Sequence, residues 1–308
     1  MDESTSRFTG PDGTQVHVRG WAPDRAPRAL VLIAHGMLEH SQRYAHVAGR
    51  LVDRGYAVYA PDHRGHGHSV TGRGTLGHLG DKDGFAAVVD DLLALSDHLR
   101  AEHPGVPLVL LGHSMGSFLA RAYAARYGDQ LAALVLSGTA GTPGVKGLLG
   151  ERVAAAEARL RGPRARSHLM TALSLGPYNR AFRPNRTDSD WLTRDEAQVD
   201  AYVADELSGA VATAGFYRDL LGGLRWVSED STASRMPHDL PVYLVSGEVD
   251  PVGGAAAVAE VAAMFERVGM RDVTSRVWPG ARHEVLQETN RGEVEDELLA
   301  WLDARFPG

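Results

Sequence analysis

The sequence of 308 residues contains no cysteine. A disulfide scaffold, a thiolate zinc site, an iron–sulfur cluster and a cysteine nucleophile are therefore excluded. An excess of positive charge is also missing, because the formal net charge is -7 at pH 7. This balance argues against nucleic acid as a partner and against a surface that binds anionic lipid broadly.

Long apolar runs are missing as well. No stretch approaches the uninterrupted apolar length of a membrane-spanning helix. The first ten residues, MDESTSRFTG, are polar and acidic, unlike a secretory signal segment. We therefore expect a cytoplasmic protein. Its length suits one large domain that carries an insertion.

Short apolar runs alternate with longer helical patterns. The runs are continuous, which is typical of strands buried on both faces. They lie at residues 30–34, 56–60, 108–111, 134–136, 242–245 and 273–277. Strands that alternate with helices predict an α/β fold, a mostly parallel sheet with helices on both faces. Phe8 and residues 15–18 predict an antiparallel hairpin at one edge, with Asp12 and Gly13 in its turn.

The alternation stops between residues 142 and 235, where the pattern is helical and few strand signals occur. We expect residues 1–141 and 236–308 to form the α/β domain and residues 142–235 to form a helical cap over the sheet. Apolar and aromatic side chains are scattered through this cap, and each can belong to the core or line a pocket. They include Leu148, Leu149, Leu169, Phe182, Trp191, Phe216 and Trp226.

The segment Gly112-His113-Ser114-Met115-Gly116 fits the pattern G-x-S-x-G between a predicted strand and a predicted helix. This strand–turn–helix setting is what the pattern requires, because a sharp turn lifts the serine oxygen above the sheet. The helix N-terminus then directs its free N–H groups toward developing negative charge. Ser114 is therefore the candidate nucleophile. The alternative is a glycine-rich helix start with Ser114 as its N-cap.

A serine hydroxyl needs a base, and the base needs a carboxylate to orient it. Asp250 follows the apolar run at 242–245, and His283 follows the run at 273–277. Both residues are expected at the same sheet edge as Ser114, in the chain order Ser, acid, His. Glu248 and Asp272 are rival acids, although Asp272 precedes its strand and should lie at the opposite edge.

Acyl transfer also requires an oxyanion hole. One donor should be the backbone N–H of Met115, directly after the candidate nucleophile. The other should come from the loop after the strand at 30–34, where Gly36 allows a tight turn and Met37 offers its N–H. Removing one such donor typically costs about 3 kcal/mol of transition-state stabilisation.

Five segments occur in a specific order: HGMLEHSQRY (35–44), DHRGHGHS (62–69), GHSMGS (112–117), SGEVDPV (246–252) and GARHEVLQE (280–288). In these segments the chain resembles the monoacylglycerol lipase and lysophospholipase branch of the α/β-hydrolases. The resemblance implies the α/β-hydrolase fold with a helical cap. It also implies Ser114, Asp250 and His283 as the catalytic triad and Met37 and Met115 as oxyanion donors. The resemblance does not extend to the cap, so it does not imply the identity of the substrate.

These observations predict hydrolysis of a carboxylic ester through an acyl-enzyme, without cofactor or metal. Monoacylglycerols, lysophospholipids and similar apolar acyl esters are the expected substrates. The same triad suits an amidase, a peptidase or an acyltransferase, and the sequence does not separate these activities. A non-catalytic ligand-binding protein on the same fold is a further alternative, although such proteins usually have a broken triad or elbow. The oligomeric state cannot be predicted.

Two other clusters have competing interpretations. Asp62, His63, His66 and His68 are dense in metal-ligand types, but their spacing does not match known metallo-hydrolase patterns. The cap also holds an arginine cluster, made of Arg159, Arg161, Arg164 and Arg166. The first interpretation of this cluster is a solvated loop, and the second is a transient contact with a membrane surface or anionic headgroups.

Overall fold

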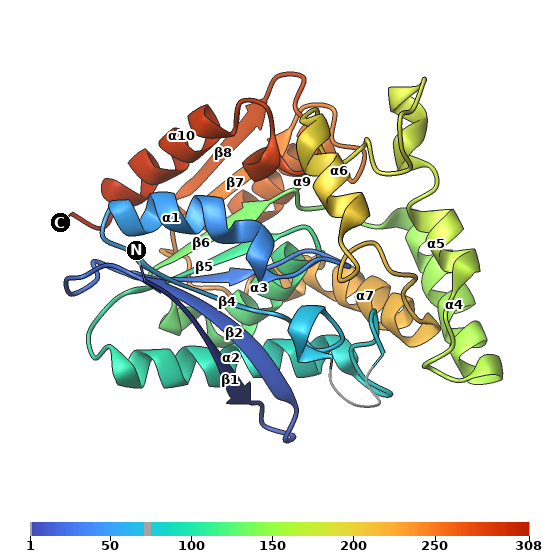
Figure 1. The fold of residues 1–308 in the computed structure, drawn as a ribbon, viewed down its shortest axis with the longest axis horizontal. Helices are drawn as coiled ribbons and strands as arrows, with labels where there is room; N and C mark the ends of the chain where they lie inside the picture. The colour runs from blue at the N-terminus through green and yellow to red at the C-terminus, as the bar shows by residue number, and fades with distance from the viewer. Residues whose placement is uncertain (1, 71–74, 308) are drawn as a thin grey trace.

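The computed structural model describes residues 2–70 and 75–307, and its eight strands form one sheet in the order β1-β2-β4-β3-β5-β6-β7-β8 (Figure 1). The strands are β1 (Asp2–Thr9), β2 (Gln15–Ala22), β3 (Leu30–Ala34), β4 (Ala57–Pro61), β5 (Leu108–His113), β6 (Ala133–Ser137), β7 (Val242–Gly247) and β8 (Val273–Trp278). The strands from β4 across to β8 are parallel, whereas β1 and β2 form an antiparallel hairpin at the edge. The predicted α/β fold is confirmed.

Consecutive residues of the central strands pack into two separate cores, because side chains alternate between the faces of a sheet. Leu30 and Leu32 of β3 face a core shared with helices α2 (Gly84–Glu102), α3 (Met115–Tyr127) and α9 (Gly254–Arg267). Val31 and Ile33 face the other core, with α1 (Ala45–Asp53) and α10 (Arg291–Asp303). Burial on both faces is why these strands are continuously apolar in the sequence.

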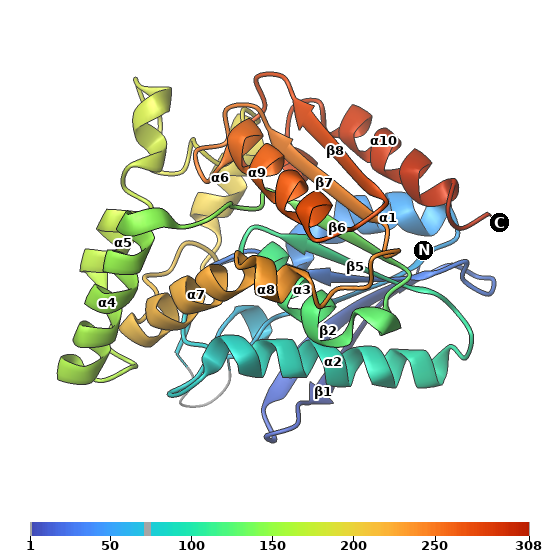
Figure 2. The same cartoon turned by 180° about the vertical axis from the view of Figure 1, so that it is seen from behind.

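Between β6 and β7 the chain is helical. The first part of this segment lies beyond one end of the sheet, whereas its last helices return along α3 on one face of the sheet (Figures 1 and 2). Its elements are α4 (Gly144–Arg161), α5 (His168–Ser174), the 3-10 helix η4 (Tyr178–Phe182), α6 (Glu196–Ala204), α7 (Ala214–Val227) and α8 (Asp230–Ala233). Helix α7 is not confined to the surface, since Phe216, Tyr217 and Val227 belong to the same core as α2 and α3. No helix of the described residues has the length and apolar character needed to cross a bilayer.

Arg121 joins this helical segment to the α/β domain. The side chain extends from α3 and is fully buried. One terminal nitrogen donates to the carbonyl of Ala140 (2.9 Å), just after β6, and the other donates to the carbonyl of Val227 (2.8 Å), at the end of α7. Burial lowers the pKa of Arg121 to about 10, so the guanidinium stays charged at neutral pH and satisfies acceptors at both ends of the helical segment.

Candidate active site

Ser114 lies at the turn between β5 and α3 with φ 52° and ψ -118°, a region that side-chain-bearing residues rarely adopt. Its N–H donates to the carbonyl of Ser137 on the neighbouring strand (2.9 Å), and its carbonyl accepts from the hydroxyl of Ser117 (2.6 Å). A side chain at Gly112 or Gly116 would collide with backbone atoms. The two glycines of the motif are therefore required by the close approach of strand, turn and helix.

Asp250 and His283 lie in the loops after β7 and β8, and the structure brings them into contact. Nδ1 of His283 is 3.0 Å from both carboxylate oxygens of Asp250. The carboxylate also accepts from the hydroxyl of Ser246 (3.0 Å) and the N–H of Val252 (2.8 Å). This contact fixes the tautomer with the proton on Nδ1, which leaves Nε2 as an acceptor.

The electrostatic interaction of His283 with Asp250 favours the ion pair, in which His283 is protonated and Asp250 is ionised. Burial lowers the pKa of His283, but the Asp250 carboxylate outweighs burial, and the net shift is upward from 6.5. Burial raises the pKa of Asp250, and the charge and hydrogen bond of His283 together with the N–H of Val252 reverse this effect and lower it. His283 is therefore a stronger base than a solvated histidine.

The two rival acids are occupied elsewhere. The carboxylate of Glu248 accepts from the N–H of Gly280 (2.9 Å). Asp272 lies before β8, at the opposite end of the strand, where its carboxylate pairs with Arg305 (2.8 Å). Asp250 is therefore the acid that contacts His283.

The backbone N–H groups of Met37 and Met115 belong to the loops beside Ser114. Among residues 2–70 and 75–307, neither group donates a hydrogen bond. The turn that carries Met37 is held by Glu39, whose carboxylate accepts the N–H of Gly36 (2.5 Å), and Leu38 adopts a positive φ of 57°. Two backbone donors thus remain available at one end of β3 and α3.

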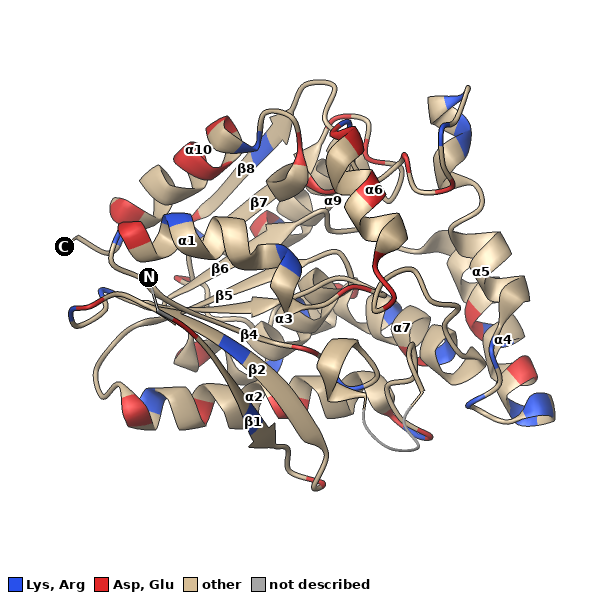
Figure 3. Cartoon of the chain, viewed as in Figure 1, with Lys and Arg blue, Asp and Glu red and all other residues tan. Residues whose placement is uncertain are grey.

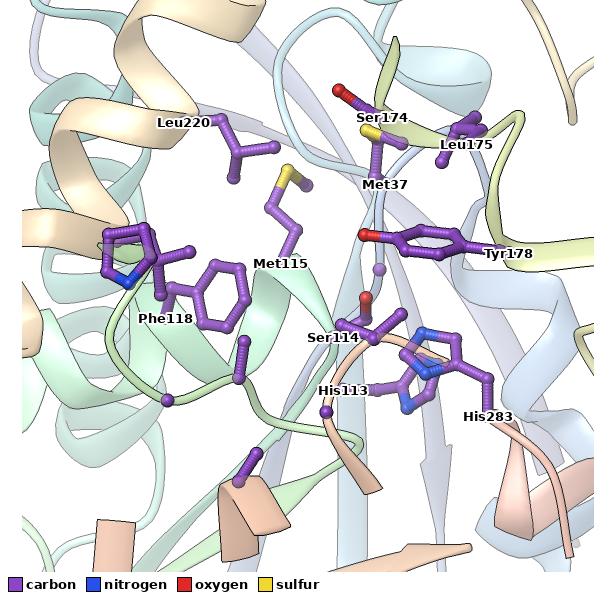
Figure 4. A pocket seen from close by; sticks show the side chains of 18 of the residues that line it. Met37, His113, Ser114, Met115, Phe118, Ser174, Leu175, Tyr178, Leu220 and His283 are labelled. Carbon is purple, nitrogen blue, oxygen red and sulfur yellow. The ribbon is translucent and has the colours of Figure 1, made fainter. Parts of the chain in front are cut away.

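A cavity of about 480 Å³ joins these groups, since Ser114, His283, Met37 and Met115 all line it (Figure 4). Much of its wall is apolar and comes from the helical segment. Figure 4 shows Leu220, Leu175 and Tyr178 around the opening above Ser114, with the His283 ring beside the serine. The helical segment between β6 and β7 therefore provides one side of the cavity, and the loops at the ends of the strands provide the candidate reactive groups.

Sequence reasoning missed a polar end of this cavity. The guanidinium of Arg43 binds Glu284 through two nitrogens (2.6 and 2.7 Å) and also contacts Glu39 (2.7 Å). The ring of Tyr202, from α6, stacks under Arg43 at 5.0 Å. His113 lines the same end, and burial lowers its pKa to about 4, with the charge of His283 adding to this shift. Glu39 and Arg43 lie in the segment 35–44 and Glu284 lies in the segment 280–288, so only the fold brings them together.

The cap residues named from the sequence separate into four groups. Of these seven, Trp191 alone lines the cavity. Phe216 is fully buried in the core, Phe182 and Trp226 are half-buried, and Leu148, Leu149 and Leu169 are exposed.

The tyrosines and leucines of the cavity wall were not anticipated, because nothing in the local pattern separates them from core residues. They are Tyr178, Tyr202, Tyr217, Leu175, Leu192, Leu220, Leu221 and Leu224.

The histidine-rich loop packs beneath the turn of Met37. His63 and His66 surround His35, with ring centroids 4.1 and 5.2 Å away, and burial lowers the pKa of all three. Asp62 accepts backbone N–H groups of Ser41 and His68, both at 2.8 Å. Within the described part of the chain, no group of three or more ligand-type side chains is arranged to hold a metal ion.

Two of the four arginines of the cluster are paired with acids, Arg161 with Glu157 and Arg164 with Asp81 (2.9 Å). Arg166 donates to the backbone carbonyls of Leu76 and Val211. Arg159 and Arg161 lie in the last turn of α4 rather than in a loop, and Figure 3 shows acidic and basic segments side by side at that end of the helix. These observations favour the interpretation of a solvated surface, although half of it is helical.

Comparison with known proteins shows the family to which the chain belongs. The model of the Hydrolase_4 family, described as "Serine aminopeptidase, S33", matches residues 25–290. A monoacylglycerol lipase of Mycolicibacterium smegmatis is 34% identical over 97% of this chain and 96% of its own, and the human monoglyceride lipase is 29% identical over 96% and 88%. A thermostable carboxyl esterase from Bacillus coagulans superposes with a TM-score of 0.91 at 27% identity, covering 99% of each chain. The chain thus belongs to the Hydrolase_4 family of serine α/β-hydrolases, and the predicted resemblance to monoacylglycerol lipases is confirmed.

Proposed function

We propose that the protein hydrolyses carboxylic esters through an acyl-enzyme, with Ser114 as nucleophile, His283 as base and Asp250 as the acid that orients it. Nε2 of His283 takes the hydroxyl proton of Ser114 as the oxygen attacks the ester carbonyl. The N–H groups of Met37 and Met115 stabilise the oxyanion. His283 then protonates the leaving alcohol and activates the water that releases the acid.

One observation carries this proposal. The buried Asp250–His283 pair and Ser114 in its strained turn meet at one cavity, together with two backbone N–H groups that have no partner among the described residues. A purely structural arrangement would not need a nucleophile, a base and two free donors at the same place. No cofactor or metal takes part in the proposed steps.

The cavity suggests the class of ester. Its apolar wall, which includes Leu220, Leu221 and Leu224 of α7, suits an acyl chain, whereas the polar lining at Glu39, Glu284 and Tyr202 suits an alcohol with hydroxyl groups. The relatives named monoacylglycerol lipase, and the esterase solved in complex with glycerol, support a glycerol-like alcohol. We therefore propose monoacylglycerols or lysophospholipids as substrates.

An amidase or peptidase is the second candidate, because the family description names an aminopeptidase. The same triad could also transfer the acyl group to an acceptor other than water. An aminopeptidase needs a free carboxylate for the substrate ammonium group. Glu39 and Glu284 are both paired with Arg43, whereas Glu260, which also lines the cavity, accepts the N–H of Thr142 (2.8 Å) and has no cation partner among the described residues. The amide therefore stays the second candidate, and matched esters and amides separate the two. A binding protein without activity is disfavoured, because no part of the predicted triad is missing.

We also retain as proposals the division into an α/β domain (1–141 and 236–308) and a cap (142–235), the cytoplasmic location, and a transient contact of the cap with a membrane surface. The exposed apolar side chains of α4 and α5 support the membrane contact better than the arginines do, since three of the four arginines have partners. The partner that we propose for the cavity itself is a small-molecule ester.

The test is labelling with a fluorophosphonate probe, with Ser114→Ala beside the wild type, followed by matched esters and amides of increasing chain length. We expect labelling of the wild type alone and a preference for esters of glycerol. Labelling of Ser114→Ala, or a better rate on the amides, would contradict the proposal.

The pH profile tests the base. Since Asp250 keeps the pKa of His283 above 6.5, activity should fall as the pH drops through that raised pKa. Asp250→Asn removes the charge that raises the pKa, so the acid limb should move to lower pH. Its kcat should fall by about 10⁴.

A further inference from the structure

A short segment of the helical region contacts the loop that carries His283. We call residues 190–194 the strap; they connect η4 to α6. The N–H of Glu284 donates to the carbonyl of Leu192 (2.7 Å), and the N–H of His283 approaches the carbonyl of Trp191 at 3.5 Å. The strap therefore lies beside the backbone of His283 and Glu284.

Side chains reinforce this backbone contact. Arg282 donates to the carbonyls of Asp190 and Thr193, and the hydroxyl of Thr193 donates to the carbonyl of Gln287 (3.0 Å). Thr193 is 1% exposed, so its hydroxyl bond is shielded from water, whereas the bonds of Arg282 are partly buried. Every residue of the strap is thereby held to the His283 loop or to its immediate neighbours.

Glu288 fastens the far end of the strap. Its carboxylate is completely buried and accepts from the N–H and the Nε of Arg194 (3.1 and 2.9 Å). It also accepts from the N–H of Arg282 (2.9 Å), one residue before His283. One buried carboxylate thus ties the strap and the His283 loop together, and charge-assisted bonds of this kind are strong.

Trp191 contacts the imidazole itself. The two ring centroids are 5.1 Å apart with an interplanar angle of 35°, and Trp191 is 9% exposed. The bond to Asp250 fixes Nδ1, and the ring of His113 also packs against the imidazole, with centroids 4.8 Å apart. Trp191 adds a second aromatic contact, which limits how far the ring can tilt and carry Nε2 away from Ser114 and keeps water off it.

We propose that the strap positions His283, with Trp191 as the positioning residue that holds the imidazole toward Ser114. The proposal rests on the proposed role of His283 as base. Trp191 itself makes no bond to substrate in the reaction. A consequence is that the cap segment and the base are mechanically coupled, because the strap belongs to one and contacts the other.

The experiment compares Trp191→Ala, Trp191→Leu and Trp191→Phe, using a short soluble ester whose acyl chain does not reach the cap. Trp191→Ala should lower kcat about 30-fold with KM nearly unchanged, because misplacement of a reacting group acts on the rate rather than on binding. Trp191→Phe keeps an aromatic face and should stay within about threefold of the wild type. Trp191→Leu, which fills the site without a ring, should resemble Trp191→Ala and serves if the alanine variant does not fold.

The acid limb of kcat/KM supplies the readout that a merely structural role would not move. The titratable groups facing His283 are Asp250, His113, Glu284 and Glu39. Burial lowers the pKa of His283, so water admitted by Trp191→Ala or Trp191→Leu should move the acid limb to higher pH. Trp226→Ala is the matched control, since this tryptophan of α7 stacks on Arg126 outside the cavity.

The outcomes separate the two proposals. If the wild type is not labelled at Ser114 by the fluorophosphonate, the proposed function fails. If the wild type is labelled and Trp191→Ala or Trp191→Leu keeps its kcat and its acid limb, the strap is a structural element only and the inference is wrong. A reduced kcat with a shifted acid limb, absent from Trp226→Ala, supports the positioning role.

Discussion

The outer half of the helical segment, residues 144–182, differs from its inner half, residues 190–227, in what the side chains contact. The outer half exposes large apolar side chains on α4 and α5, namely Val145, Leu148, Leu149, Leu160, Leu169 and Leu173. The inner half is attached to the loops that carry the reactive groups. The comparison suggests that the outer half admits the substrate and that the inner half aligns the groups that act on it.

The inner half has several attachments, and three of them hold elements next to the proposed site. The strap holds the His283 loop, and Arg121 holds the end of α7. The end of α6 and the loop after it contact the oxyanion turn, where Asp205 binds His40 (2.6 Å) and the N–H of Gly209 donates to the carbonyl of Leu38 (3.0 Å). Movement of the inner half would therefore displace both His283, the proposed base, and the turn of Met37, the proposed oxyanion donor.

The largest effect is expected when the buried tie of the strap is broken. Glu288→Ala removes a carboxylate that accepts from Nε of Arg194 and from the backbone N–H groups of Arg194, Arg282 and Thr289. The Arg194 side chain is 34% exposed and can turn to water, whereas the three N–H groups lose their acceptor. We expect a loss of about 2–4 kcal/mol in the free energy of unfolding. Urea denaturation measures it. Glu293→Ala, at an exposed position of α10, is the control and should cost less than about 0.5 kcal/mol. If Glu288→Ala and Glu293→Ala lower the free energy of unfolding equally, the strap does not depend on the buried carboxylate.

A smaller effect is expected at the oxyanion turn. Asp205→Ala removes the acceptor of His40 and the cap of the turn at Leu207 and Ser208. Stability should fall by about 1–2 kcal/mol, and kcat by roughly fivefold, because the turn of Met37 becomes looser. Steady-state kinetics and thermal unfolding measure both. Asp200→Ala, an exposed α6 aspartate paired with Arg186, should change neither.

Substitutions in the outer half should change activity on aggregated substrates without changing stability. The double substitution of Leu148 and Leu149 by serine removes exposed apolar surface and no core contact, so stability should change by less than about 0.5 kcal/mol. Activity on emulsified or vesicle-borne long-chain esters should fall severalfold, while activity on a soluble short ester stays constant. Assays on both substrates measure the ratio. A parallel loss on the two substrates would mean that the outer half also aligns the active site.

The smallest effect is expected at the arginine cluster. Arg159→Glu reverses an exposed charge that has no ion-pair partner among the described residues. If the membrane contact is mainly apolar, binding to anionic vesicles should weaken by less than about threefold, which is the scale of one charge near a surface. Vesicle sedimentation at low and moderate salt measures it. A much larger loss would restore the arginines as the membrane-binding element.

The sequence sufficed for features that are local in the chain. The strands buried on both faces are continuous apolar runs, and the elbow at Ser114 is a five-residue pattern between a strand and a helix. Asp250 and His283 could be found because each follows a strand, so the sheet alone places them at one edge. Even so, β5 continues to His113, two residues past the predicted end, because the polar residues before Ser114 still pair with β6.

Features that depend on distant residues could not be predicted. The pairs of Arg43 with Glu284 and of Arg194 with Glu288 join residues 241 and 94 positions apart. No periodicity in the sequence marks the partners, since each is an ordinary charged residue in its own segment. The same holds for Trp191, which from the sequence alone is one of several aromatic residues in the cap.

The guanidinium of Arg121 bears on how this architecture can be rebuilt. It is an α3 side chain, and both of its acceptors, the carbonyls of Ala140 and Val227, lie between β6 and β7. A chimera that exchanges this region for that of a relative must therefore place two carbonyls at the same points. Without them a charged guanidinium would be left unpaired in the core. The backbone positions at the two ends of the helical segment, more than its helices, therefore determine which exchanged segments allow the chain to fold.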